Sequence, residues 1–66
     1  MLSGSEVCEI LKQHDFVLAR QRGSHRIMQK SMEGTTITVP VPLHDPLTLL
    51  SIIRQSGLAK SLFEID

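Results

Sequence analysis

Residues 35–41 constrain the fold more than any other segment, because β-branched side chains occupy six of these seven positions. Such side chains favour strands, where they pack well on a pleated surface. Pro40 lies within the run and has no backbone N–H to donate to a neighbouring strand. The segment is therefore predicted to be a strand at the edge of a sheet, or one that ends at a bulge.

A first helix is predicted at the start of the chain. Ser3 and Glu6 have the spacing of a capping box, in which each side chain binds the backbone N–H of the other residue. Apolar residues then recur on one helical face, and the pattern ends near residues 14–15. The apolar face comprises Val7, Cys8, Ile10 and Leu11.

A second helix is predicted to end at Gly57, with Thr48, or Asp45 followed by Pro46, as its N-terminal cap. The side chains expected to face the core are Leu49, Leu50, Ile52 and Ile53. The tail that follows is expected to pack back on the domain through Leu62, Phe63 and Ile65.

Two further strands are predicted over residues 16–22 and 25–30, joined by a tight turn at Gly23 and Ser24. Alternation places Phe16 and Leu18 on one face of the first strand, and Ile27 and Gln29 on one face of the second. The other face of the second strand carries Arg26, Met28 and Lys30. Residues 31–34 are predicted to form the turn into the proline-containing strand.

The predicted order is helix, three strands and helix within a chain of 66 residues, which is long enough for one domain only, spanning residues 1–66. The expected fold class is α+β, with two helices on one face of a three-stranded antiparallel sheet. Double-stranded-RNA-binding domains use this same order of elements.

The single cysteine, Cys8, excludes an internal disulfide and a cysteine-based zinc site, and it fits a reducing compartment. Its place in an apolar helical stripe favours a core role over that of a reactive thiol. The sequence contains no apolar run near the length of a membrane span. A cytoplasmic protein without membrane association is expected.

The charge is segregated along the chain although the formal net charge is zero. Residues 16–32 contain four cationic side chains and no acid. Five of the seven acids lie outside this stretch and toward the ends, namely Glu6, Glu9, Asp15, Glu64 and Asp66. One face is therefore predicted to meet a polyanion such as RNA.

His25 is the candidate catalytic residue, because it follows a glycine-marked turn and has Arg20, Arg22 and Arg26 within five positions. A histidine exchanges a proton near neutral pH, and guanidinium groups bind phosphate. The competing interpretation is a solvated basic hairpin with one surface histidine.

Three other side chains join the candidate site. Lys30 and the three arginines are candidate RNA-binding residues, together with Ser24, for which turn formation is the favoured role. His44 is a candidate second proton carrier, although a loop contact with Asp45 is the simpler role.

No cofactor or metal is expected. The three histidines, His14, His25 and His44, are spread over different predicted elements, and no paired cysteines support them. His14 is expected to lie at the end of the first helix, where an imidazolium interacts favourably with the terminal carbonyls.

Together these segments resemble the HicA family of toxin mRNA interferases over nearly the whole chain. The resemblance is carried by the opening helix with Ser3 and Glu6, by Phe16 leading to Arg20, and by the Gly23-Ser24-His25 signature. It continues through residues 39–44 and the helix of residues 49–58.

The resemblance implies a double-stranded-RNA-binding-like fold, ribosome-independent cleavage of mRNA, inhibition of translation and neutralisation by a HicB-type antitoxin. His25 takes the catalytic position of the family. One departure precedes the last helix, where Pro46-Leu47-Thr48-Leu49 replaces the family's Pro-Gly-Thr-Leu. Loss of this glycine is expected to alter the approach of the loop to RNA or antitoxin without affecting His25.

The chemistry expected of His25 is that of a general base in a metal-independent nuclease, because RNA supplies its own nucleophile, the 2′-OH. An alternative is a noncatalytic RNA-binding module, which would favour lysines where the last helix has Leu49-Leu50-Ser51. A protein-interaction module is a further alternative. It overlaps with the nuclease hypothesis, since a toxin must bind its antitoxin in a hetero-oligomer.

Overall fold

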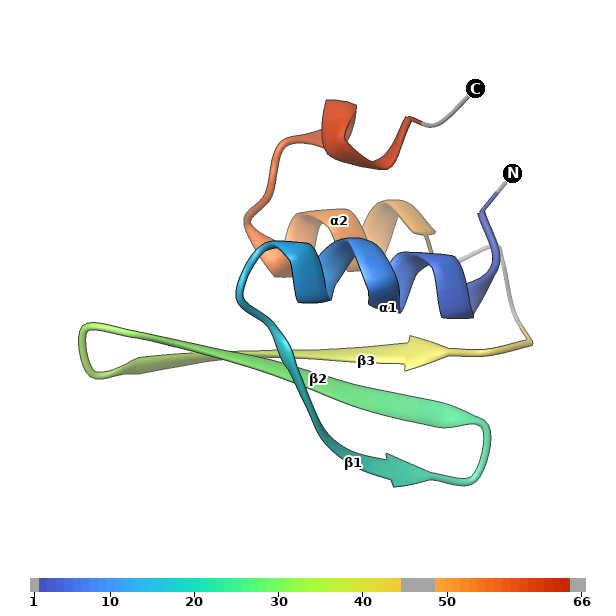
Figure 1. Ribbon diagram of the computed structural model, residues 1–66, viewed down its shortest axis with the longest axis horizontal. Coiled ribbons are helices and arrows are strands. Elements are labelled where there is room, and N and C mark those ends of the chain that lie inside the picture. The colour runs from blue at the N-terminus through green and yellow to red at the C-terminus, as the bar shows by residue number, and fades with distance from the viewer. Residues whose placement is uncertain (1, 45–48, 65–66) are drawn as a thin grey trace.

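The computed structural model describes residues 2–44 and 49–64, and it has the predicted order of helix, three strands and helix, with a short 3₁₀ helix added (Figure 1). The elements are α1 (Gly4–Gln13), β1 (Val17–Arg22), β2 (His25–Met32), β3 (Thr35–Pro42), α2 (Leu49–Ser56) and η2 (Lys60–Phe63). Both α-helices lie on the same side of the sheet (Figure 1). The predicted α+β fold is confirmed.

The three strands form an antiparallel sheet in the order β1-β2-β3. β3 is an edge strand, as the position of Pro40 predicted, because an edge does not require every backbone N–H to be paired. Glu33 and Gly34 both have positive φ, at 45° and 83°, as a two-residue type I′ turn requires. Since two residues suffice for this turn, β2 continues to Met32, beyond the predicted strand.

The start of α1 has the predicted capping box. The Ser3 hydroxyl accepts a hydrogen bond from the Glu6 N–H at 3.1 Å, and the Glu6 carboxylate accepts one from the Ser3 N–H at 2.8 Å. These bonds lower the pKa of Glu6, because they stabilise its ionised form. The helix ends at Gln13 with His14 as its C-cap, close to the predicted boundary.

The core lies between the helices and the sheet, and it includes the apolar face predicted for α1. Cys8 is fully buried there, and Phe63 of η2 is 4% exposed. The core cluster is completed by Leu2, Val7, Ile10, Leu11, Phe16, Met28, Val39, Val41, Ile52 and Ile53. The predicted core role of Cys8 is therefore confirmed.

Two predicted core residues are exposed instead. Leu50 has 63% of its surface exposed, because the buried stripe of α2 runs through positions 52, 53 and 56 at helical spacing and leaves position 50 to one side. Ser56 fills the last of these positions, and its hydroxyl donates to the Ile53 carbonyl at 2.7 Å. In the tail, Leu62 is 38% exposed while the adjacent Phe63 turns inward.

The predicted caps of α2, at Thr48 or at Asp45 with Pro46, lie outside the described residues. The same is true of Ile65, of the side chain of Leu49 and of the position where the family's glycine is replaced.

Candidate functional site

His25 is the first residue of β2 and is exposed. Its backbone pairs with Arg22 on one side and with Pro42 on the other, so two neighbouring strands fix its position. The preceding turn is tight, with Gly23 at φ 60° and the Gln21 side-chain amide donating to the Gly23 carbonyl at 3.2 Å. A histidine at the end of a three-stranded ladder is thus held rigidly at its backbone while its ring meets solvent.

The hairpin pairing determines which arginines share a face with His25. Leu18 pairs with Met28, but Arg20 pairs with Ile27, so Ala19 is an extra residue in β1. In a regular ladder through Ala19, Arg20 would be opposite Arg26 instead. The bulge shifts the pairing by one residue.

We call the side of the sheet away from α1 and α2 the open face. Met28 and its partner Val39 are fully buried in the core, so residues that alternate with them along β2 and β3 point the other way. The open face therefore carries His25, Ile27, Gln29 and Ser31 of β2 with their partners on β1 and β3.

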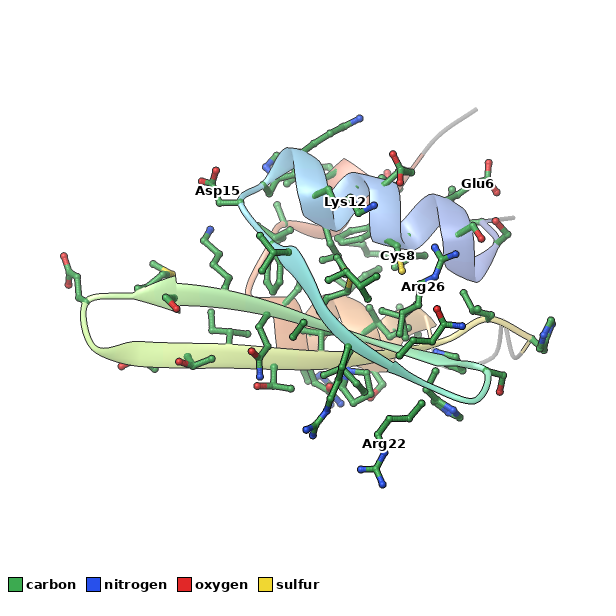
Figure 2. All side chains as sticks on the ribbon, turned by 60° about the horizontal axis from the view of Figure 1, so that its bottom comes forward. Glu6, Cys8, Lys12, Asp15, Arg22 and Arg26 are labelled. Carbon is green, nitrogen blue, oxygen red and sulfur yellow. The ribbon has the colours of Figure 1, made fainter. Side chains whose placement is uncertain are left out.

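Arg20 and Arg22 share the open face with His25, because directly paired residues in an antiparallel sheet point to the same side. Both arginines are exposed. Figure 2 shows Arg22 extending away from the helices. Among the described residues of the three strands, none on this face is acidic, so its charge is positive.

Arg26 and Lys30 lie on the opposite, helix-covered face. Arg26 extends toward Cys8 of α1 (Figure 2), and its Nε atom is buried without a hydrogen-bond partner. The Lys30 Nζ atom lies 5.7 Å from the centre of the Phe16 ring, the geometry of a cation–π contact. The structure therefore separates these two predicted RNA-binding residues from His25.

The neighbourhood of Cys8 opposes ionisation of its thiol. Burial raises the pKa of Cys8, and the nearby Arg26 guanidinium offsets part of this effect through a hydrogen bond and its positive charge. A thiol with a raised pKa and no exposed surface is a poor nucleophile.

The predicted second proton carrier, His44, lies at the same end of the sheet as His25. The Leu43 N–H donates to the Ser24 carbonyl at 2.8 Å, which extends the pairing of β2 and β3 by one step. His44 follows directly and is exposed, whereas Ser24 is half-buried in the turn. Asp45, the predicted loop partner of His44, lies outside the described residues.

Gly4 supports this end of the site, and sequence reasoning missed that role. A Cβ atom at Gly4 would lie 2.7 Å from the Pro42 carbonyl oxygen and 2.8 Å from the Leu43 Cα. Glycine thus allows the start of α1 to approach the backbone that leads to His44. The sequence feature that could have indicated this role was a glycine in the first turn of the helix, where alanine has the higher helix propensity.

Within residues 2–44 and 49–64, no three histidine, cysteine or acidic side chains gather in a way that would hold a metal ion. No helix in the described part of the chain combines the length and apolar character needed to cross a membrane.

Comparison with protein-family models matches residues 4–58 to the family described as the HicA toxin of bacterial toxin-antitoxin. The match includes both α-helices, the whole sheet and the His25 turn. No curated protein and no solved structure matches the chain.

Proposed function

Since the chain belongs to the HicA toxin family of bacterial toxin-antitoxin systems, we propose that it is an endoribonuclease that cleaves mRNA and inhibits translation. The observation that carries this proposal is the placement of His25 beside Arg22 on an exposed sheet face, with Arg20 on the same face. A proton acceptor and two phosphate-binding groups are among the parts that RNA cleavage requires.

In the proposed reaction, His25 removes the proton from a ribose 2′-OH, and this oxygen attacks the adjacent phosphorus. The bond from phosphorus to the 5′-oxygen breaks, leaving a 2′,3′-cyclic phosphate on one product and a 5′-OH on the other. Arg22 and Arg20 stabilise the extra negative charge that develops on the phosphoryl oxygens. We assign His44 as the acid that protonates the leaving 5′-oxygen, because it lies at the same end of the sheet.

The reaction requires no cofactor, because the nucleophile belongs to the substrate. Arg26 and Lys30 are not assigned to the phosphate, since their side chains lie on the helix-covered face. Ser24 contributes mainly through its carbonyl, which positions the segment before His44.

A HicB-type antitoxin is the proposed protein partner. An acidic segment of this partner that covered Arg22 and His25 would block access to RNA and form a hetero-oligomer by charge complementarity. Because such a partner binds only the folded toxin, it also raises the toxin's unfolding temperature.

The proposal is tested by incubating the purified chain with a labelled RNA in EDTA and identifying the product ends. We expect cleavage to 2′,3′-cyclic phosphate and 5′-OH ends. The control is the same RNA with 2′-deoxyribose at the cleaved position, which should remain intact. Absence of cleavage of the all-ribose RNA, or equal cleavage of both substrates, would contradict the mechanism.

A further inference from the structure

The open face continues beyond His25 as a row of amide and hydroxyl side chains. Gln29 pairs with Thr38, and Ser31 pairs with Thr36, so all four side chains lie on the same face as His25. Thr36, Thr38 and Ser31 are exposed, and the Gln29 amide donates to the Thr38 hydroxyl at 3.3 Å. We call these four residues the polar row.

The polar row lies on the same face of the sheet as the catalytic end. Along β3, the six residue steps from Thr36 to Pro42, which is the partner of His25, span roughly 20 Å. Between the two ends lie Ile27 and its partner Pro40, which carry no charge. A nucleic-acid strand bound at His25 and directed along β3 would therefore meet no carboxylate on the described open face.

The exposed side of α1 is less suited to a polyanion. The exposed side of α1 carries Glu6 and Glu9, and the cation on this side, Lys12, lies 3.4 Å from the Glu9 carboxylate. These carboxylates repel phosphate, whereas the open face presents hydrogen-bond donors and no carboxylate on its described strand residues.

We propose that the polar row is a subsite for RNA, on which an unpaired segment next to the cleaved nucleotide lies along β2 and β3. This inference rests on the proposed function, because it takes RNA as the substrate. Hydroxyl and amide groups bind phosphate oxygens and ribose 2′-OH groups, which occur at every nucleotide. No Phe, Tyr or Trp side chain lies on the described open face to stack on bases, so the row binds with little sequence preference.

An unpaired segment suits this surface better than a duplex. In-line attack by a 2′-oxygen requires the reacting nucleotide to adopt a specific backbone geometry, which an unpaired strand reaches without losing base pairs. The subsite thus binds the same unpaired strand that the catalytic end cleaves.

The test measures RNA binding in the His25→Ala background, so that bound RNA is not consumed. The variant removes two hydroxyls from the row through Thr36→Val and Thr38→Val, which preserve β-branching and size. The matched control is Thr35→Val, because Thr35 is exposed on the same strand but points to the helix-covered side. Ser31→Ala tests the row independently from β2, and circular dichroism establishes that each variant is folded.

We expect the double variant to bind an unpaired RNA oligonucleotide about tenfold more weakly, from the loss of two hydrogen bonds. Thr35→Val should bind within about twofold of the background, and Ser31→Ala should weaken binding in the same direction as the double variant. Unchanged affinity of the folded double variant, or an equal loss in Thr35→Val, would overturn the subsite. Tighter binding of a duplex of the same sequence would overturn the assignment to an unpaired strand.

The cleavage assay separates this inference from the proposed function. Weakened binding in the row variants without any cleavage by the wild-type chain supports the subsite and contradicts the nuclease. Normal cleavage with unchanged binding in the row variants supports the nuclease and overturns the subsite.

Discussion

Arg22 and Arg26 lie four positions apart in the sequence but extend from opposite sides of the sheet (Figure 2). Arg22 is opposite His25 on the open face, whereas Arg26 extends to the buried Cys8 on the helix-covered face. Two cations that are equivalent in a sequence pattern therefore have different environments.

Removal of each charge should have a different effect on cleavage. Arg22→Gln is expected to lower kcat/KM by roughly 10- to 100-fold, because it removes a charged hydrogen bond to the phosphate. Arg26→Gln should leave kcat/KM within a few-fold of wild type. The measurement is single-turnover cleavage at several salt concentrations, where Arg22→Gln should also reduce the salt slope of RNA binding by about one. Equal losses in both variants would contradict the assignment of the site to one face.

Cys8 is expected to be unreactive in the folded protein. Iodoacetamide at pH 8 should modify it only as fast as the protein unfolds, because the thiol is fully buried and burial raises its pKa. Equal alkylation rates for folded and urea-unfolded protein would contradict this expectation.

The raised pKa of Cys8 also predicts a loss of stability at alkaline pH. The unfolded thiol ionises first, at about pH 8.5, while the folded thiol remains protonated. The free energy of unfolding should therefore fall as the pH rises from the unfolded pKa toward the folded pKa. Urea denaturation at pH 7 and pH 9.5 measures this change, and it should be smaller in Cys8→Ala.

The capping box predicts that the free energy of unfolding falls as the pH is lowered into the acid range. Ser3→Ala should reduce the free energy of unfolding by about 1 kcal/mol at pH 7, because it removes the acceptor for the Glu6 N–H. The lowered pKa of Glu6 means that the carboxylate stabilises the fold above its unfolded pKa and that this contribution is lost as the pH falls through the folded pKa. Urea denaturation should therefore show a smaller effect of Ser3→Ala at pH 3 than at pH 7.

Gly4→Ala should destabilise the protein although alanine is the better helix former. The added Cβ would contact the Pro42 carbonyl oxygen at 2.7 Å, so we expect a loss of about 1–3 kcal/mol. Ser5→Ala is the matched control, because Ser5 is exposed on the same turn and should change stability little. Thermal denaturation compares the two, and a stabilised Gly4→Ala would contradict the close approach of α1 to β3.

Local features of the sequence were sufficient to predict much of the fold. Ser3 and Glu6 indicated where α1 begins, Gly23 indicated the first hairpin turn, and Pro40 indicated an edge strand. Each of these features acts through backbone geometry or a short-range hydrogen bond, which does not depend on distant packing.

Features that depend on pairing between elements were not predicted. The extra residue Ala19 becomes apparent only from the pairing of β1 with β2, so the separation of Arg22 from Arg26 did not follow from a charge pattern. Leu50 was wrongly assigned to the core, because its exposure depends on which stripe of α2 contacts β3.

The proposed role of His25 is tested most directly by the single-turnover cleavage rate of His25→Ala on a labelled RNA in EDTA, with His14→Ala as the control. His14 is the C-cap of α1, and its removal should leave the rate unchanged. We predict that His25→Ala keeps the wild-type circular dichroism spectrum and loses at least about 100-fold in rate, the contribution of a general base. Cleavage at the wild-type rate by folded His25→Ala would contradict the assignment of His25 as the catalytic base.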